Sequence, residues 1–238
     1  MTVEEAIQRV WSMESRGVQT FDSRLTERHI YSCLLTARAV ILSQKVNKKQ
    51  AISQWIYQTL SCVPMTKASP IECAGLSLSG DCGVLRSVDK LPKPITGLKG
   101  SAILSVTSVD GSENFDITEF HLQKYGAGNK YTKNRPDGYF RNGYLYITGK
   151  KALKAITVVQ LCDDPVEAEI FNIKNSKELC NTCYNVYDFN MYIDKDSEKP
   201  IIDIAQQEAI GLFKQMTQDK STNTDDDNAP SLMTSGGQ

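Results

Sequence analysis

The chain has 238 residues, of which 40% are hydrophobic and 23% charged, and its formal net charge at pH 7 is -1. This composition is typical of a soluble globular protein and excludes a collagen-like or largely disordered chain. The small net charge gives no whole-molecule attraction for nucleic acid or for an anionic membrane. No apolar run reaches the ~20 residues of a membrane span, and the first 20 residues lack a signal-peptide core. We therefore expect synthesis in a cytosol-like compartment and no membrane contact.

The first predicted element is a helix that begins with a capping motif. Residues Thr2 to Glu5 fit the S/T-x-x-E capping box, in which the hydroxyl and the carboxylate each accept a hydrogen bond from an unpaired backbone N–H. Apolar residues at helical spacing then continue toward Gly17. A first helix is therefore predicted from residue 3 to about Gly17.

A second helix is predicted over residues 26–47, because apolar residues recur every three or four positions along it. A shorter helical or irregular piece is predicted over residues 52–60. It ends before Pro64, which has no backbone N–H to continue a helix. Residues 1–64 are thus predicted to form a helical bundle region.

From residue 65 onward, the pattern changes to alternating apolar and polar residues with frequent Gly, Pro, Ser and Thr. Strand-like runs precede Asp110-Gly111 and flank Asn142-Gly143, dipeptides that tolerate the positive φ of tight hairpin turns. Another strand is predicted over residues 155–161. We therefore expect residues 65–198 to form an antiparallel β-sandwich or small barrel.

The end of the chain predicts one more helix and a tail. Residues 199–216 carry Pro200 in the first turn and apolar residues at helical spacing, which favours a C-terminal helix that packs on the bundle. Residues 217–238 are polar and rich in Asp, so they bury too little apolar surface to fold alone. We expect a flexible acidic tail that becomes ordered on partner binding. The predicted fold class is α+β: an N-terminal helical bundle, completed by a C-terminal helix, with an intervening β domain.

Catalytic chemistry has little support in the sequence. Cys180 and Cys183 have the CxxC spacing of half a zinc site or of a redox pair, but no second close pair completes four thiolates. His29 and His121 are the two histidines, and no G-x-S-x-G elbow accompanies them. We therefore expect no enzyme activity, no cofactor and no metal, with reduced and mostly buried cysteines. A zinc- or thiol-dependent enzyme built on Cys180 and Cys183 is the alternative.

Charge is unevenly distributed along the chain. Basic residues that are candidates for a partner-binding face lie along and just after the second predicted helix: Arg28, Arg38, Lys45, Lys48 and Lys49. Their acidic counterparts in the tail are Asp225, Asp226 and Asp227. In a repeating ring, the tail of one subunit can bind the basic face of another, whereas in a monomer both are solvated surface.

A second basic cluster lies within the predicted β domain. Lys130, Lys133 and Arg135 surround Tyr131, and cations mixed with an aromatic side chain are suited to contact nucleic-acid phosphates. These residues are our candidates for contact with DNA in a channel. An ordinary solvated loop between strands is the alternative.

Several segments resemble structural proteins of crAss-like and related short-tailed bacteriophages. The resemblance is carried by residues 21–31 (FDSRLTERHIY), 58–64 (QTLSCVP), 142–147 (NGYLYI) and 161–165 (LCDDP). It extends over residues 1 to 215 or so. Cys162 departs from it, because an aromatic residue is expected at that position.

The resemblance implies a head-to-tail connector, or ring adaptor, rather than an enzyme. Such proteins combine a helical bundle with an inserted β domain, assemble as dodecamers under the portal, and extend the DNA channel from capsid into tail. The implied partners are further copies of the chain, the portal protein, other tail or ring proteins and, non-specifically, packaged DNA. The implied location is the head–tail interface of the virion, after synthesis in the host cytoplasm. A tail-hub or capsid-decorating protein is the alternative.

Overall fold

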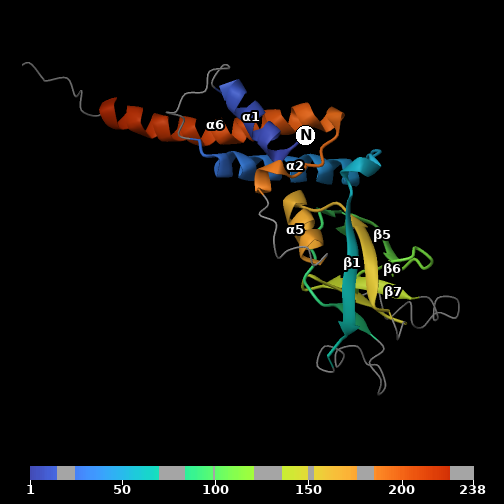
Figure 1. Cartoon of the computed structure of the whole chain (residues 1–238). Helices are drawn as coiled ribbons and strands as arrows, with labels where there is room; N and C mark the ends of the chain where they lie inside the picture. The colour runs from blue at the N-terminus through green and yellow to red at the C-terminus, as the bar shows by residue number, and fades with distance from the viewer. Residues whose placement is uncertain are drawn as a thin grey trace, which may run out of the picture.

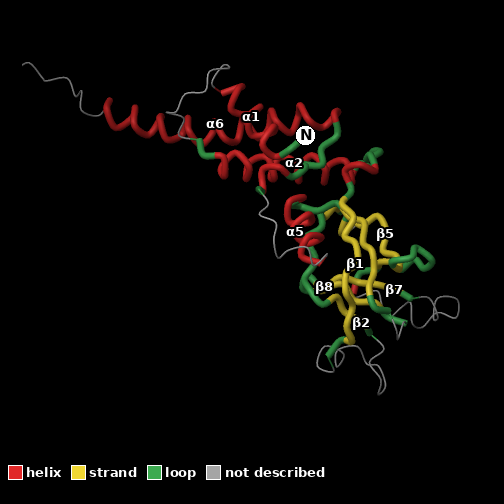
Figure 2. The backbone as a smooth tube through the Cα atoms, viewed as in Figure 1, coloured by secondary structure: helices red, strands yellow, loops and turns green. Residues whose placement is uncertain are grey.

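The computed structural model describes residues 1–14, 25–69, 84–98, 100–120, 136–149, 153–175 and 185–225. Within these ranges, a layer of long helices lies at one end of the molecule and a β-rich part lies at the other (Figures 1 and 2). The chain passes from helices to strands and back to a helix. None of the described helices is long and apolar enough to cross a membrane.

The helical layer consists of α1 (Val3–Glu14), α2 (Glu27–Asn47) and α6 (Lys195–Asp225). The predicted capping box is present at the start of α1, because Thr2 N–H donates to Glu5 Oε2 at 2.9 Å and Glu5 N–H donates to Thr2 Oγ1 at 3.1 Å. Thr26 caps α2 in a similar way, since its hydroxyl accepts a hydrogen bond from His29 N–H. The second predicted helix is therefore confirmed, and the first is confirmed as far as Glu14, because its predicted end near Gly17 lies outside the described residues.

The interior of this layer is apolar and draws on every one of its helices. Its fully buried members include Val3, Ile7 and Val10 from α1, Ile30, Leu34 and Ala37 from α2, and Ile201, Ala205 and Ala209 from α6. Each large aliphatic side chain buried in this way contributes about 1.5–3 kcal/mol. The N-terminus is also held by backbone bonds, because Val3 N–H donates to Phe189 O at 2.9 Å and Met191 N–H donates to Met1 O at 3.1 Å. The beginning and the end of the chain thus build one bundle.

The β-rich part is a nearly closed barrel. Among the described residues, seven strands form one sheet in the order β5-β9-β1-β2-β8-β7-β6. They are β1 (Gln58–Lys67), β2 (Leu85–Ser87), β5 (Ile103–Ser108), β6 (Asp116–Ile117), β7 (Asp137–Arg141), β8 (Tyr144–Ile147) and β9 (Ala155–Gln160). Neighbours are antiparallel except β6 and β7, and β3 (Thr96–Gly97) and β4 (Gly100–Ser101) form a separate hairpin. The edge strand β5 approaches β6 through a bridge between Thr107 and Asn114 and a 2.8 Å bond from Phe115 N–H to Val106 O. The α+β fold class is confirmed, with the barrel as the form of the β domain.

The strongest hairpin prediction is also confirmed. Asn142 and Gly143 connect β7 to β8 with φ values of 54° and 83°, and positive φ at both central residues defines a type I′ turn. Gly111 likewise has a positive φ of 71° in the turn after β5. The local turn chemistry therefore determined these two reversals of the chain.

Two predicted boundaries are wrong. Residues 58–60, expected in a helical or irregular piece, instead begin β1. The helical part of the expected piece 52–60, all of which the structure describes, is the 3-10 helix Gln54–Ile56. Pro64 lies inside β1, at the last pair of its register with β9, which fits the confinement of proline to irregular positions in sheets. The second error concerns residues 217–225, which were expected in the flexible tail and instead continue α6. A helix that is already nucleated by tertiary packing extends at little cost. Residues 226–238 lie outside the described ranges.

One helix was not predicted. Helix α5 (Pro165–Asn175) follows β9 directly and contributes Ala168 and Phe171 to the core of the barrel. It lies between α2 and the strands in Figure 1. The helix therefore closes one side of the barrel and reaches the junction with the bundle.

Candidate assembly interface

Arg38 connects α2 to the β-rich part from inside the molecule. Its guanidinium is 0% exposed, and Nη1 donates to the carbonyl oxygens of Cys162 at 2.7 Å and Asp163 at 3.2 Å. Its Nε donates a longer bond of 3.5 Å to Tyr192 O. One side chain thus links α2 to the segment after β9 and to the segment before α6. The prediction that Arg38 belongs to an exposed basic face is wrong, because the guanidinium is used within the subunit.

The electrostatic surroundings of Arg38 explain how a buried cation is tolerated. Burial lowers the pKa of Arg38 to about 10, and the nearby Cys162, Asp164 and Asp163 oppose this decrease. The guanidinium therefore remains charged at neutral pH. Its Nη2 has no hydrogen-bond partner within the described part of the chain. Arg38 is a costly group to bury, and removing it leaves backbone carbonyls without a donor.

Polar contacts around Arg38 lock the start of α5 to α2. Tyr31 Oη donates to Asp164 Oδ1 at 2.8 Å, and the same oxygen accepts a hydrogen bond from Val166 N–H at 2.8 Å. Burial and the charge of Asp164 both raise the pKa of the Tyr31 phenol. Cys162 N–H donates to Gln58 Oε1 at 2.8 Å, so the beginning of β1 joins the same network. The helical layer and the barrel are therefore held together by directed bonds as well as by apolar packing.

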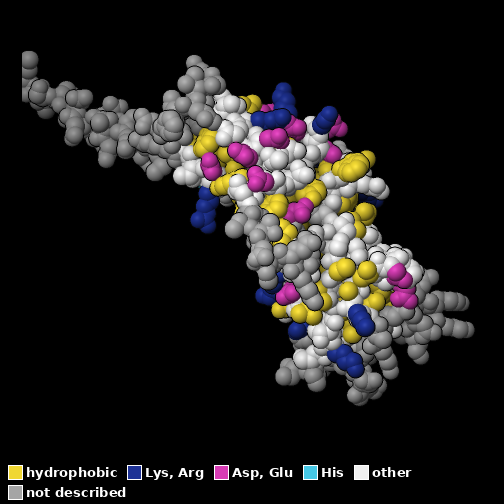
Figure 3. Space-filling model, viewed as in Figure 1, with side chains coloured by type: hydrophobic (Ala, Val, Ile, Leu, Met, Phe, Trp, Pro, Cys, Tyr) yellow, Lys and Arg dark blue, Asp and Glu magenta, His cyan; other side chains and the backbone are white. Residues whose placement is uncertain are grey.

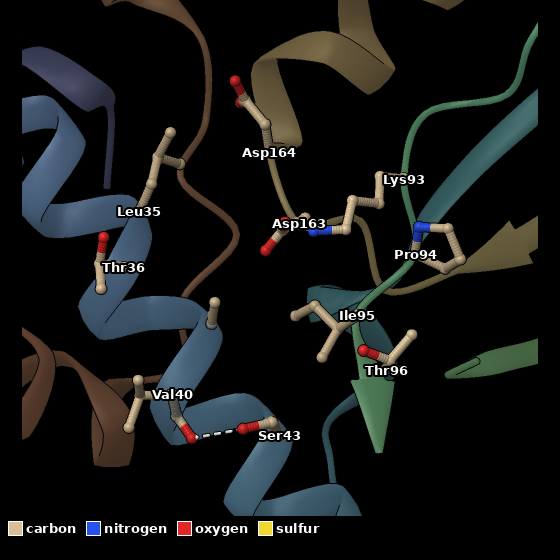
Figure 4. Close-up of a pocket in the computed structure, with 11 residues that line it drawn as sticks. Leu35, Thr36, Val40, Ser43, Lys93, Pro94, Ile95, Thr96, Asp163 and Asp164 are labelled. Carbon is tan, nitrogen blue, oxygen red and sulfur yellow. Dashed lines mark hydrogen bonds and ion pairs between the residues drawn. The ribbon is translucent and has the colours of Figure 1, made fainter. Parts of the chain in front are cut away.

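A groove opens on the outer side of this junction, between α2 and the segment 93–96 (Figure 4). Its volume is about 460 Å³, and its lining residues are Leu35, Thr36, Ala39, Val40, Ser43, Lys93, Pro94, Ile95, Thr96, Asp163 and Asp164. Figure 4 shows α2 on one side, the 93–96 segment on the other, and Asp163 and Asp164 toward one end. Lys93 Nζ forms an ion pair with Asp163 Oδ2 at 2.9 Å beside the apolar part. The groove is thus mainly apolar, with charged side chains at one end. Val40, which lines it, is 39% exposed.

Two further large apolar side chains are exposed in segments that pack near α2, since Ile56 and Ile95 share a buried cluster with Leu42. Trp55 is 88% exposed and Leu98 is 89% exposed. Leu98 N–H donates to Asn47 Oδ1 at 2.7 Å, which holds the β3–β4 turn against the last residue of α2. Figure 3 shows hydrophobic side chains at the surface of both the helical and the β-rich parts. Large apolar side chains left this exposed are candidates for contact with another chain.

The other predicted basic residues do not form one face. Lys48 and Lys49 are exposed at the end of α2, and Lys45 is half-buried, with Nζ donating to Ser197 Oγ at 2.6 Å. Arg28 is exposed at the opposite end of α2, roughly 30 Å away along the helix. Lys48 and Lys49 therefore lie at the end of α2 that contacts the β3–β4 turn with Leu98, whereas Arg28 stands apart.

Several predicted site residues are not described by the structure. Asp225 is the last residue of α6, and its side chain is not described. The remaining ones lie outside the described ranges: Lys130, Lys133, Arg135, Cys180, Cys183, Asp226 and Asp227. Within those ranges, no group of three or more His, Cys, Asp or Glu residues is arranged to hold a metal ion.

The groove and the Tyr31–Asp164 contact were missed by the sequence analysis. Asp164-Pro165 carried a usable signal, because Asp before a proline at the first helical position is a helix-start pattern. The groove had no such signal, since α2 and the segment 93–96 are separated by about 50 residues in sequence and meet only in the fold.

Comparisons with known proteins place the chain in a family. A family model described as phage tail ring protein 2, of the crAss-like phages, matches residues 5–228. The match covers the helical layer and the barrel alike. A search of curated proteins finds no significant match. The chain thus belongs to the phage tail ring protein 2 family, and it is a structural component of the virion.

Proposed function

We propose that the protein is the repeating subunit of a ring in the head-to-tail connector, where it docks on the portal and extends the DNA channel into the tail. The observation that carries the proposal is the exposure of Trp55 and Leu98 beside the groove-bearing helix α2. Side chains of this size left in water favour burial against another chain. In a ring protein, the first candidate for that chain is another copy of itself.

The junction at Arg38 supports the same role. Since Arg38, Tyr31 and Asp164 tie the helical layer to the barrel, the subunit can join a ring as one rigid body. A head-to-tail contact between identical rigid bodies repeats by a fixed rotation and closes when that rotation divides a full circle. The proposed ring is a dodecamer, as the family resemblance implies.

The charged residues supply the remaining contacts in this proposal. Lys48 and Lys49 are exposed at the end of α2 that contacts the turn with Leu98, so they are our candidates for a basic rim of the subunit or portal interface. Exposed rim charges affect the rate and salt dependence of association more than its strength. Asp225, Asp226 and Asp227 are the proposed acidic contacts at the end of the chain, and Arg28 is a separate basic contact.

The proposed contact with DNA is non-specific. Lys130, Lys133 and Arg135 are assigned to the channel surface, where cations repeated around a ring neutralise phosphates without reading sequence. The net charge of -1 per chain is compatible with DNA that must slide through the channel.

The test combines the full-length chain with the portal ring. We expect mass photometry to show a ring complex on the portal, and electron microscopy of virions to place the chain on the head–tail axis. The double variant Trp55→Ser and Leu98→Ser should stay folded and lose assembly by about tenfold or more, because both side chains are exposed in the isolated subunit.

A matched control is available in two other exposed apolar residues. The double variant Val88→Ser and Val109→Ser changes side chains that are 45% and 53% exposed, and it should assemble like the natural chain. The proposal fails if the natural chain forms no complex with portal at any stoichiometry. It also fails if virion density places the chain away from the head–tail axis, as expected for a capsid-decorating protein.

A further inference from the structure

The outer side of the barrel carries a layer of aromatic rings on strands β7 and β8. Leu145 and Ile147 of β8 belong to the core inside the barrel, so the residues that alternate with them face outward. Tyr139 and Tyr146 are paired across the two strands on this outer side, and their rings stack with centroids 5.0 Å apart. The ring of Phe120 packs against Tyr139, with centroids 5.2 Å apart. These strands therefore carry a packed aromatic layer on their outer side.

Three cations lie over rings of this outer side. The guanidinium of Arg86 is 4.7 Å from the ring centroid of Tyr144, and that of Arg141 is 4.7 Å from the centroid of Phe120. Lys90 Nζ is 6.0 Å from the Tyr144 centroid. A cation within about 6 Å of a ring centroid is attracted to the face of the ring, which holds the charged group in place. We call Arg86, Lys90, Arg141, Phe120 and Tyr144 the hairpin patch, because it lies beside the β7–β8 hairpin.

The sheet explains why these cations meet. Arg141 and Tyr144 are paired at the end of the β7–β8 hairpin, and Arg86 lies on β2, which pairs with β8. Lys90 packs along the turn, because its side-chain carbons lie 3.6–3.8 Å from the position of a Cβ on Gly143. Figure 2 shows β2, β7 and β8 in the part of the barrel that lies away from the long helices. The hairpin patch is therefore separate from α2, which carries the proposed contacts between copies.

The hairpin patch is more basic than the chain as a whole, whose formal net charge is -1. Lys90 and Arg141 are exposed, and neither is paired with a carboxylate within the described part of the chain. The carboxylate of the neighbouring Asp89 is paired with Lys174 Nζ of α5 at 3.6 Å, which balances its charge. Positive charge therefore remains on this side of the barrel for a partner to neutralise.

An exposed cation that is held on an aromatic ring is well suited to bind phosphate. The planar guanidinium of Arg141 can donate two hydrogen bonds to one phosphate, and the ammonium of Lys90 binds phosphate as a point charge. Because the rings already restrict these side chains, less conformational entropy is lost on binding. Strand β8 separates β2 from β7, so Arg86 and Arg141 are about 10 Å apart across the sheet. This spacing suits several phosphates of a polymer better than one small anion.

The polyanion that a tail ring surrounds in the proposed function is DNA. We propose that the hairpin patch binds the sugar–phosphate backbone of double-stranded DNA, so that the β7–β8 side of the barrel faces the channel. The inference rests on the proposed function only for the identity of this polymer. It adds described residues to the contact assigned above to Lys130, Lys133 and Arg135. Contacts of this kind position DNA without reading its sequence.

The first experiment removes two cations of the hairpin patch. The full-length natural chain and the double variant Lys90→Gln and Arg141→Gln are titrated with random-sequence duplex DNA between about 50 and 200 mM salt, and binding is followed by fluorescence anisotropy. We expect the affinity of the variant at the lower salt to be about tenfold or more below that of the natural chain. The slope of log K against log salt should decrease by about 1.8, because each lost phosphate contact removes about 0.9. Circular dichroism confirms that the variant is folded.

Two further variants make this result specific. The double variant Lys195→Gln and Lys199→Gln removes the same charge from exposed side chains near the start of α6, and it should bind DNA like the natural chain. Tyr144→Leu keeps every cation and removes one ring. It should weaken binding about threefold with an unchanged salt slope, because the cations are held less well but none is lost. An unchanged affinity in this variant would overturn the role of the ring.

The second experiment locates DNA in assembled particles. Val88 is 45% exposed and lies between Arg86 and Lys90 in the sequence, so a photoreactive benzoylphenylalanine in its place reports what contacts the hairpin patch. This group should cross-link to DNA. The same group in place of Gln44, which is exposed on α2, should not. Cross-linking to DNA from position 44 and not from position 88 would place the helical bundle toward the channel and overturn the inference.

The outcomes separate this inference from the proposed function. The inference is wrong if the natural chain binds no DNA at about 50 mM salt, or if the Lys90 and Arg141 variant binds DNA as the natural chain does. It is also wrong if that variant loses binding to the portal instead of to DNA, because the hairpin patch is then a protein contact. The connector role stands in these cases if the natural chain forms rings on the portal. If DNA binds as expected but no portal complex forms, the connector role is wrong and the DNA contact stands.

Discussion

The two sides of α2 differ in what they contact. The inner side carries apolar residues of the bundle core together with Arg38, whose guanidinium is bonded to backbone carbonyls of distant segments. The outer side carries small and half-exposed residues such as Thr36, Ala39 and Val40, which line an open groove. Substitutions on the inner side should therefore change the stability of the subunit, and those on the outer side should change association between subunits. A helix divided in this way lets assembly vary while the fold stays constant.

The largest expected effect comes from Arg38→Ala. The variant removes the donor for Cys162 O and Asp163 O and leaves a cavity at the junction. We expect the free energy of unfolding to fall by about 3–4 kcal/mol, partly offset because a buried charge is also removed. Urea unfolding followed by circular dichroism measures the change. Thr36→Ala on the outer side of α2 is the matched control and should change stability by no more than about 0.5 kcal/mol. Similar losses of unfolding free energy in both variants would show that the two sides of α2 do not differ in their contribution to stability.

The second prediction concerns the pH dependence of stability that the buried Cys162 thiol causes on the inner side of α2. Burial raises the pKa of the Cys162 thiol from 9.0 to about 11, whereas the thiol in the unfolded chain keeps its ordinary pKa. Between these values, the unfolded chain has lost the proton that the folded chain retains. The contribution of the Cys162 thiol to the free energy of unfolding is therefore complete below about pH 9. It decreases by about 2 kcal/mol as the pH rises toward 11.

The measurement compares the natural chain with Cys162→Ala under reducing conditions. Unfolding by urea at pH 8 and pH 10.5 should show a steeper loss for the natural chain, because the variant lacks the titrating thiol at the junction. Other phenols and thiols titrate in both proteins and cancel in the difference. Parallel profiles would mean that the pKa of Cys162 is not raised by the fold.

The smallest of these effects concerns Tyr31→Phe. The substitution removes one hydrogen bond to Asp164 Oδ1 and keeps the aromatic ring, and Val166 N–H still bonds to that oxygen. We expect a loss of about 1 kcal/mol in the free energy of unfolding. Thermal unfolding of this variant beside Ser32→Ala, an exposed change on the same helix, measures it. An equal shift of the melting temperature in both variants would show that the hydrogen bond of Tyr31 does not stabilise the junction.

Much of the fold was predictable because local patterns determine it. The capping box at Thr2, the periodicity of α2 and the Asn142-Gly143 turn act within a few residues, and each formed as predicted. Helix α5 was missed because it is short and follows directly on a strand, so the surrounding β pattern dominated the interpretation. The prediction of a tail from residue 217 failed because the packed part of α6 nucleates the helix that follows it.

The candidate interface was less predictable, because it depends on contacts between distant residues. Arg38 was assigned to the surface since a cation beside an apolar stripe usually faces water. Its acceptor Cys162 O is 124 positions away in sequence, and only the fold brings the two together. Lys48 and Lys49 are exposed as a basic contact requires, and their role in binding stays a prediction. The exposure of Trp55 and Leu98 had no local signal at all.

The backbone bonds between the N-terminus and the segment before α6 constrain how the protein is made. Val3 N–H is bonded to Phe189 O, so α1 cannot take its final place until about 190 residues have left the ribosome. The barrel is synthesised complete before that moment, and it can fold while α1 and α2 are still waiting for α6. During this interval, the apolar sides of α1 and α2 are available to chaperones or to other nascent chains. The synthesis of α6 thus decides when a subunit becomes competent to join the particle.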